Sequence, residues 1–288
     1  MDSGREHQKE GRRSLHYHQI RPSPLLASFV QCYWTIKVET RGLPAPDHGV
    51  MPGGYVDLVF NVGDKVCKSD SGGVFVAQAK SFVIGPFDRF QRFRVEGQFE
   101  FLGVRFHQGR SPFCSDLPLG EVRNQAVPLS AVWEDARLTA EIQTLEFRLA
   151  QESQTGRRIV CVEQFLIKFL GSWKEPDVVV TQALDLIEEA KGQISVENLA
   201  SVLGVSSRHL ERKFIQYVGL SPKAFCRVTR FRHVKLLLES IHGPSGCDLA
   251  YACGYYDQTH LIREFRSFTG QTPARYERSQ PVGFFLYD

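Results

Sequence analysis

The first half of the chain, over residues 15–128, consists of short apolar or alternating runs separated by turn residues. The segment Arg89–Val95 alternates polar and apolar side chains, which is typical of a strand with one buried face. Turn-forming pairs such as Gly53-Gly54 lie between the runs. Several short strands at this spacing predict an all-β sandwich or barrel. The predicted strands are Phe29–Val38, Tyr55–Val62, Gly73–Ala77, Ser81–Ile84, Phe90–Val95 and Phe99–Phe106.

The apolar spacing changes to a helical period near residue 130. One helix is predicted over Ala131–Gln151, with Ser130 as its N-cap, and another over Arg157–Leu170. Beyond the segment Gly171–Pro176 the pattern is helical throughout. The chain is therefore predicted to be an α+β protein of two domains. The predicted divisions are a disordered arm over residues 1–14, a β-rich regulatory or dimerisation domain with C-terminal helices over 15–172, a linker over 173–177 and a helical domain over 178–288.

An internal duplication occupies the last third of the chain. The second copy follows the first by about 50 residues and has one extra residue between its first glycine and its leucine. An offset of this size indicates a repeated supersecondary unit rather than a repeated domain. The corresponding positions are Ala200, Gly204, Leu210, Phe214, Gly219 and Pro222 in the first copy and Ala250, Gly254, Leu261, Phe265, Gly270 and Pro273 in the second.

The spacing within each copy predicts a short helix, a glycine turn and a second helix. In the first copy, Ser195 is expected to cap the first helix and Gly204 to end it in a left-handed conformation. Ser206 or Ser207 is expected to cap the next helix. That helix has one apolar face, made by Leu210, Phe214 and Tyr217. Each copy is therefore predicted to be a helix-turn-helix unit, and the helical domain a tandem of two.

Polar side chains lie opposite the apolar face in both copies. In a helix-turn-helix unit the second helix enters the major groove of DNA, and the arginine fork pairs with both acceptors of guanine. Because Arg212 and Arg263 occupy equivalent places, we predict that both read bases. The free face holds Arg208, Arg212 and Ile215 in the first copy, with Glu211 at its flank, and Thr259, Arg263 and Arg266 in the second, with Gln258 at its edge.

The distribution of charge supports a nucleic-acid partner for this part of the chain. The whole chain has 35 Lys or Arg and 32 Asp or Glu, a net charge of +3 that by itself indicates no partner. Residues 204–280 alone hold 12 Lys or Arg and 6 Asp or Glu, a balance of +6, so the remainder sums to about −3. A localised basic patch of this kind binds phosphates and releases counterions.

The stretch Asp248–Tyr276, which reads DLAYACGYYDQTHLIREFRSFTGQTPARY, resembles the signature of the AraC/XylS family of bacterial transcription regulators. With the duplication, the resemblance extends over Ser195–Arg278. It implies seven helices in two lobes, joined by a long helix over Pro222–Ser240, with one helix of each lobe in successive major grooves. The implied base-reading residues are Arg208, Glu211, Arg212, Gln258, Thr259 and Arg263, and the predicted phosphate contacts are Lys213 and Arg266.

The N-terminal runs Met51–Asn61 and Phe101–Phe106 resemble a cupin-like sensor or dimerisation domain of the same family. The resemblance implies a cytoplasmic transcription regulator that is not an enzyme and uses no cofactor or metal. Double-stranded DNA is the predicted partner, and a small-molecule effector, a second copy of the chain in a homodimer and RNA polymerase are further candidates. The operator, the effector and the sign of regulation stay open.

Two other interpretations of the N-terminal domain also stay open. In the first, the N-terminal domain serves dimerisation alone. In the second, it is a cupin-type metalloenzyme, which would require a metal triad. His16 and His18 share one face of a predicted strand, but no third ligand follows at cupin-like spacing. In the linker helix, three arginines either contact the DNA backbone or are solvated, and we favour the solvated interpretation; they are Arg227, Arg230 and Arg232.

The cysteines and the apolar runs indicate where in the cell the protein is expected to be. The chain has 7 cysteines and no C-x-x-C pair, which predicts reduced thiols. No uncharged apolar stretch is long enough for a membrane helix, and the polar N-terminus lacks the apolar core of a secretory signal. These features favour a cytoplasmic, membrane-free protein.

Overall fold

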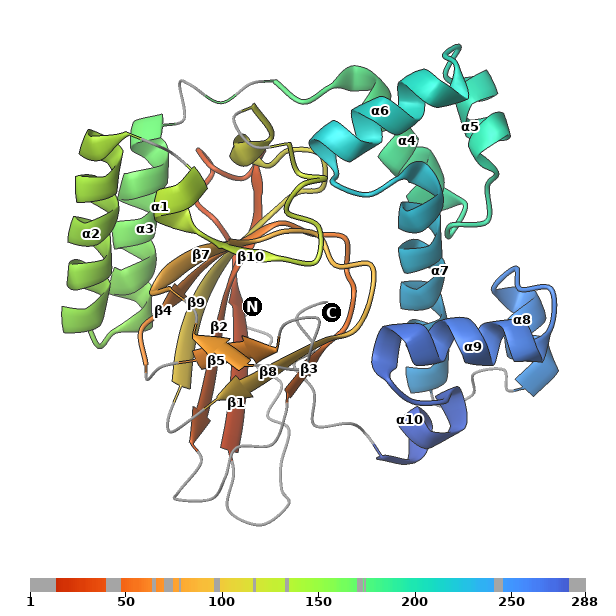
Figure 1. The fold of residues 1–288 in the computed structure, drawn as a ribbon, viewed down its shortest axis with the longest axis horizontal. Coiled ribbons are helices and arrows are strands. Elements are labelled where there is room, and N and C mark those ends of the chain that lie inside the picture. Colours follow the sequence, from red (N-terminus) through yellow and green to blue (C-terminus); the bar gives the residue numbers. More distant parts are fainter. Residues whose placement is uncertain are drawn as a thin grey trace.

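A computed structural model gives the fold of the chain (Figure 1). The residues that it describes are 14–39, 48–63, 66–69, 75–77, 79–95, 99–115, 118–132, 135–169, 173, 175–240 and 246–279. The arm predicted over residues 1–14 lies outside this set except for Ser14, which begins the first strand. The predicted domain divisions stay predictions, although a helix begins at Val178, one residue beyond the predicted linker.

The β-rich part is a pair of sheets. A six-stranded sheet has the order β1-β2-β9-β4-β7-β10, and a four-stranded sheet has the order β3-β8-β5-β6. Among the residues that the structure describes, the six-stranded sheet runs from β1 at one edge to β10 at the other and is not closed, so of the two predicted forms the sandwich is the one observed. The strands are β1 Ser14–Ile20, β2 Val30–Glu39, β3 His48–Val50, β4 Asp57–Asn61, β5 Val66–Ser69, β6 Phe75–Ala77, β7 Ser81–Ile84, β8 Gln91–Val95, β9 Phe99–Phe106 and β10 Ala126–Pro128.

The helices follow the predicted order with one error. The helix expected over Ala131–Gln151 is split in two, because Asp135 rather than Ser130 is the N-cap of the longer piece and accepts a hydrogen bond from the Leu138 N–H. The α-helices are α1 Leu129–Val132, α2 Ala136–Gln151, α3 Thr155–Phe169, α4 Val178–Glu189, α5 Val196–Val202, α6 Ser207–Tyr217, α7 Pro222–Glu239, α8 Gly246–Ala252, α9 Gln258–Thr269 and α10 Pro273–Ser279. Within the described part of the chain, none of them combines the length and apolar character that crossing a membrane requires.

The six-stranded sheet is covered on both faces. On one face, Leu58 of β4 packs in the same apolar cluster as Ile142 of α2 and Val162 of α3. On the other face, Val59 of β4 packs in a cluster with Val50 of β3. Figure 1 shows α2 and α3 side by side along one side of the sheet. Because β4 has no solvent-facing side, its central residues Leu58, Val59 and Phe60 are all apolar, without the polar alternation of a half-buried strand.

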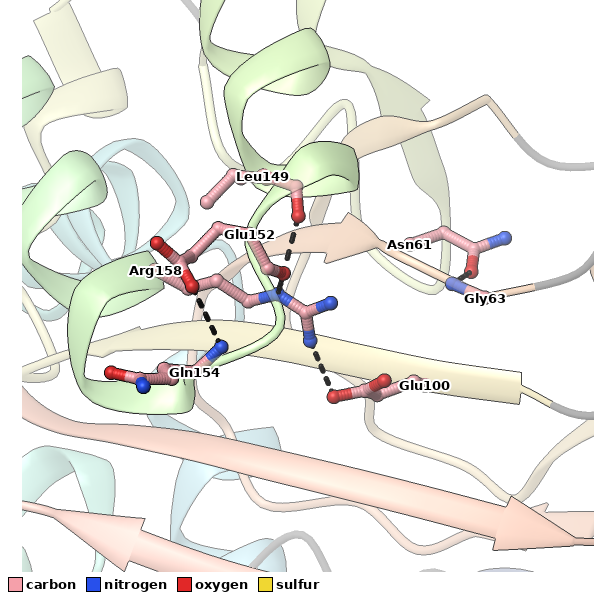
Figure 2. Close-up of polar contacts among 7 residues, drawn as sticks. All are labelled: Asn61, Gly63, Glu100, Leu149, Glu152, Gln154 and Arg158. Atoms are coloured by element: carbon pink, nitrogen blue, oxygen red, sulfur yellow. Dashed lines mark hydrogen bonds and ion pairs between the residues drawn. The ribbon is translucent and has the colours of Figure 1, made fainter.

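Arg158 fastens the α2–α3 pair to the sheet (Figure 2). Its Nε donates hydrogen bonds to the carbonyls of Leu149 and Glu152 at the end of α2, and its Nη1 donates to Glu100 of β9. The last carbonyls of a helix lack partners within it, so this guanidinium satisfies two of them while it pairs with a carboxylate. Arg158 is buried, and Figure 2 shows it between the helix end and the strand.

A buried ion pair joins two neighbouring strands. Asp57 of β4 lies opposite Arg105 of β9, whose Nε and Nη2 each donate to one carboxylate oxygen at 3.0 Å. The side chains are 1% and 2% exposed, respectively. The guanidinium carbon of Arg105 also lies 4.9 Å from the centre of the Tyr55 ring. The two charges compensate each other inside the protein, so the loss of either one removes the buried counter-charge of the other.

Asp57→Ala is therefore expected to lower the free energy of unfolding of the N-terminal domain by about 3–5 kcal/mol. All three tryptophans, Trp34, Trp133 and Trp173, precede the helical domain, so tryptophan fluorescence during urea denaturation follows this domain. The double variant Asp57→Leu/Arg105→Met serves as control and should lose less stability, because it removes both charges together. Equal losses in the two proteins would contradict the prediction.

Candidate nucleic-acid interface

Seven helices, α4 to α10, form two lobes along one shared helix. The first half of α7 supplies Phe225 and Val228 to the apolar core of α4, α5 and α6. Its second half supplies Phe231 and Val234 to the core of α8, α9 and α10. Figure 1 shows the two lobes at opposite ends of α7. The predicted arrangement of two helical lobes joined by a long helix is confirmed.

The first lobe contains the predicted helix-turn-helix unit. Ser195 caps α5 and accepts a hydrogen bond from the Asn198 N–H, and Gly204 follows the helix with a φ of 66°. Of the two residues expected to cap the next helix, Ser206 does so by accepting from the His209 N–H. A left-handed residue is required at the turn, which explains the glycine.

The second lobe repeats this geometry with a longer turn. Gly254 follows α8 with a φ of 71°, and Asp257 caps α9 by accepting a hydrogen bond of 2.6 Å from the His260 N–H. Between them lie Tyr255, which is buried, and Tyr256, which is exposed. Tyr256 is therefore the extra residue of the second copy, because the first copy has one residue fewer between its glycine and its cap.

The predicted buried faces of α6 and α9 are largely confirmed. Leu210 and Phe214 of α6 are 0% exposed, whereas Tyr217 is only partly buried. Leu261 and Phe265 of α9 are 1% exposed. Each of the two helices is thus anchored by a leucine and a phenylalanine four residues apart, which fixes which side chains face outward.

All six predicted base-reading residues have exposed side chains on α6 and α9. They are Arg208, Glu211, Arg212, Gln258, Thr259 and Arg263. An Nη2 of Arg212 lies 3.2 Å from Nδ1 of His209, one turn earlier on the same face. Arg266, a predicted phosphate contact, is exposed as well. The placement leaves these side chains accessible to a groove, and their roles in DNA binding stay predictions.

Two other residues of α6 have partners inside the protein. Lys213, the second predicted phosphate contact, forms an ion pair with Asp177, which caps α4. Although burial by itself raises the pKa of Asp177, the hydrogen bonds from Lys213 and from the backbone of Val180 outweigh it and lower that pKa. Ile215, expected on the free face, lies against Gly120 of the N-terminal domain.

A buried carboxylate that sequence reasoning missed connects α7 to α9. Glu264 of α9 is 6% exposed and accepts hydrogen bonds from Arg227 Nε at 2.8 Å and from Tyr255 Oη at 3.1 Å. Arg230 lies 3.8 Å from the same carboxylate. Burial and the Glu264 charge together raise the pKa of Tyr255, so the phenol stays protonated and donates. The sequence signal is that Glu264 interrupts the apolar face between Leu261 and Phe265.

The interpretation of the α7 arginines as solvated is therefore wrong. Arg227 and Arg230 pair with Glu264 of the second lobe. Arg232 pairs with Glu188 of α4 and donates a hydrogen bond of 2.9 Å to Tyr55 Oη of the N-terminal domain. The sequence of α7 alone could not show this, because the partners of these cations lie on distant segments of the chain.

No metal site accompanies this arrangement in the described part of the chain, where no three His, Cys, Asp or Glu side chains are grouped to hold an ion. His16 and His18, the pair considered for a metal, are both exposed on β1.

Comparison with known proteins shows which families the two parts of the chain resemble. Residues 199–279 match a family model described as a helix-turn-helix domain, and residues 18–128 match a domain of unknown function, DUF6597. The HTH-type transcriptional regulator YbfI of Bacillus subtilis, itself uncharacterised, is 29% identical over 134 residues, which are 43% of this chain and 48% of that protein. An uncharacterised HTH-type regulator of Staphylococcus aureus is 32% identical over 107 residues, 37% of this chain and 14% of its own length.

Two solved structures are similar as well. ToxT from Vibrio cholerae is 10% identical, with a TM-score of 0.47 over 85% of this chain and 97% of that one. A regulator from Chromobacterium violaceum with an AraC-type DNA-binding domain is 28% identical, with a TM-score of 0.34 over 36% of this chain and 93% of that one. This chain thus spans about half or less of the curated relatives and nearly all of these two solved chains.

The helical region is thus a tandem helix-turn-helix DNA-binding domain. It is of the AraC type, as the sequence resemblance implied, and it follows a β-rich domain that matches the family of unknown function.

Replacing Glu264 by Ala should destabilise the helical domain by about 3–5 kcal/mol, since Arg227 and Arg230 would lose their buried counter-charge. Far-UV circular dichroism during urea denaturation of the full chain measures the loss of helix. The exposed carboxylate of Glu211 on α6 provides the matched control, and Glu211→Ala should change stability by no more than about 0.5 kcal/mol. Similar stabilities of the two variants would show that the buried network contributes little.

Proposed function

We propose that this protein is a sequence-specific transcription regulator that binds double-stranded DNA through α6 and α9. The observation that carries the proposal is the equivalence of the two helices: each follows a left-handed glycine turn and turns exposed polar side chains outward from a buried leucine and phenylalanine. The basic balance of residues 204–280 supports it. The protein is proposed to act without catalysis, in line with relatives described as transcriptional regulators.

Arg212→Ala and Arg263→Ala should each weaken binding to the preferred duplex by about 1–3 kcal/mol and relax the preference at one base pair. Selection of duplexes from a random-sequence pool, followed by binding titrations at fixed salt, measures both effects. Arg157→Ala on α3 is the control, because it removes one exposed cation from the N-terminal domain and should leave base preference unchanged. Unchanged affinity in both helix variants would refute the assignment of α6 and α9 as reading helices.

The N-terminal domain touches both reading helices at their C-terminal ends. On α6, the Gln216 carbonyl accepts a hydrogen bond of 3.4 Å from the Leu119 N–H. On α9, the Ser267 carbonyl accepts one of 3.3 Å from the Phe90 N–H. Bases are read mainly by the N-terminal residues of a recognition helix, so these contacts leave the reading ends accessible.

The contact surface also crosses α7, between the two lobes. Tyr55 accepts the hydrogen bond from Arg232, and Met51 lies in the apolar cluster of the second lobe with Phe231. The N-terminal domain therefore touches the first lobe, the shared helix and the second lobe at once. A rotation of one lobe relative to the other about α7 would break some of these contacts.

The two loops that reach α6 and α9 are tied to each other. Asn124 donates from Nδ2 to Asp88 Oδ1 at 2.8 Å and accepts at Oδ1 from the Asp88 N–H at 3.1 Å. Its own N–H donates to the Pro86 carbonyl, and its φ of 60° is one that asparagine tolerates better than most residues. We propose that events in the N-terminal domain change DNA binding by shifting these loops, and with them the arrangement of α6 and α9.

Gly120→Val tests this coupling. A Cβ atom on Gly120 would come within 2.6 Å of Ile215 Cγ2, so the variant should separate the loop from α6 without disturbing either core. Once the lobes are less firmly held, binding must order them, and affinity for the preferred duplex is expected to fall by about threefold or more. Titration of the full chain with that duplex measures the change.

Gly156→Val is the matched control for that substitution. Gly156 lies on α3 with nothing within 4 Å of a Cβ atom, so its variant should bind DNA like the wild type. Equal affinities of the Gly120 variant, the Gly156 variant and the wild type would show that the interface does not influence DNA binding.

Two proposals concern what the N-terminal domain itself binds. A homodimer through α2 and α3 is supported by apolar side chains on their outer surfaces, with Phe147 67% and Val160 51% exposed.

A small-molecule effector is supported by Trp34, whose buried Nε1 has no hydrogen-bond partner within the described part of the chain. A polar ligand atom would satisfy such a donor. RNA polymerase stays a partner implied by the sequence resemblance.

A further inference from the structure

Two tyrosines beside α9 are almost completely exposed. Tyr251 on α8 is 86% exposed, and Tyr256, the extra residue in the turn before α9, is 92% exposed. We refer to these two residues as the tyrosine pair. The first lobe has Ser201 at the position of Tyr251 and no counterpart of Tyr256. The pair is therefore a property of the second lobe alone.

The tyrosine pair lies where a helix-turn-helix unit meets the DNA backbone. In such a unit the first helix crosses the sugar–phosphate backbone while the second enters the major groove with its N-terminal end. Tyr251 is on the first helix of the second lobe, and Tyr256 immediately precedes Asp257, the N-cap of the second helix. Tyrosine hydroxyls are among the groups that donate hydrogen bonds to phosphate oxygens.

The charge of the second lobe points to neutral contacts of this kind. From Gly246 to Thr269, α8 and α9 with their turn hold two basic residues and three acidic ones, which are Arg263, Arg266, Asp248, Asp257 and Glu264. The matching segment of the first lobe holds three basic residues and two acidic ones, which are Arg208, Arg212, Lys213, Glu197 and Glu211. The second lobe thus has fewer cations with which to bind phosphates, and uncharged donors can supply the missing contacts.

We propose that the tyrosine pair binds phosphates of the DNA backbone beside the bases that α9 reads, with both hydroxyls donating to phosphate oxygens. The inference rests on the proposed function, because it assigns further contacts to the same DNA-binding surface. These contacts position α9 on the duplex without reading sequence. They also add affinity without adding charge, which distinguishes them from contacts made by Lys or Arg.

The double variant Tyr251→Phe/Tyr256→Phe tests the role of the hydroxyls, since it keeps both rings at exposed positions where folding is not at risk. Its dissociation constant should rise by about a hundredfold or more, because two hydrogen bonds to charged groups are lost and each is worth about tenfold or more. The rise should be the same for the duplex selected by the wild type and for a duplex of unrelated sequence. The slope of log K against log salt concentration should stay at the wild-type value, because no charge is removed.

Two further variants separate this result from general effects. Arg266→Ala removes a cation from the same helix and, if Arg266 contacts a phosphate, should reduce the salt slope by about 0.9. Leu236→Ala removes an exposed apolar side chain from α7, away from both turns, and should leave affinity unchanged.

The outcomes distinguish this inference from the proposed function. A wild-type chain that binds neither duplex contradicts the proposed function itself. A wild type that binds while the double variant binds equally well overturns the role of the tyrosine pair alone. A loss confined to the selected duplex also overturns it, because it would mean that the hydroxyls read bases. Unchanged DNA binding with an altered sedimentation coefficient would instead assign the pair to contacts between copies of the chain.

Discussion

The arrangement of the DNA-binding domain depends on one constraint, which is that a single helix is buried in two cores. Phe225 and Val228 of α7 belong to the core of the first lobe, and Phe231 and Val234 belong to that of the second. Neither lobe can change its position along α7 without exposing apolar surface. The separation of α6 and α9 is consequently set by how far apart the two buried stretches lie on one helix. Glu264 adds a directional restraint, since Arg227 and Arg230 hold α9 in one orientation against α7.

The N-terminal domain has a different relation to this framework. It contributes two long backbone hydrogen bonds of 3.3 and 3.4 Å, glycine contacts, one arginine–tyrosine bond and the Met51 side chain in the core of the second lobe, rather than a large shared core. Contacts of this kind are individually weak, so they can form and break at modest cost in free energy. These contacts lie on both lobes, so the N-terminal domain can affect how the two lobes are arranged around α7. The fold thus combines a rigid connection within the DNA-binding domain with a looser one between the domains.

Local patterns in the sequence were sufficient for much of this picture. The duplicated glycines, caps and apolar faces predicted two helix-turn-helix units, because each depends on residues within one or two turns of a helix. Strands β7 and β9 were predicted with the bounds that they have, whereas β3, β5 and β10, of three or four residues each, were not predicted. The break before α2 was missed because the apolar period continues across Asp135.

What the sequence could not show depends on contacts between distant segments. Arg227 and Glu264 are 37 residues apart, and Arg232 and Tyr55 are 177 apart. Whether a basic residue on α7 is solvated or paired is decided by which helix packs beside it, and periodicity contains no information about that. The choice between barrel and sandwich is similar, because it depends on whether β1 and β10 meet. The exposure of the predicted base readers, in contrast, followed from the buried face of each helix.

The ion pair between Lys213 and Asp177 has a consequence for the energetics of DNA binding. Lys213 already holds an anion, because the carboxylate that caps α4 occupies its ammonium group. If a phosphate replaces that carboxylate, one anionic partner is exchanged for another, and Asp177 is left to rely on backbone N–H donors. The gain from such a contact is the difference between two ionic interactions rather than the whole of one. Lys213 would then add little affinity. Instead, a phosphate bound at α6 would change the ionic partner of Asp177, the residue that caps α4.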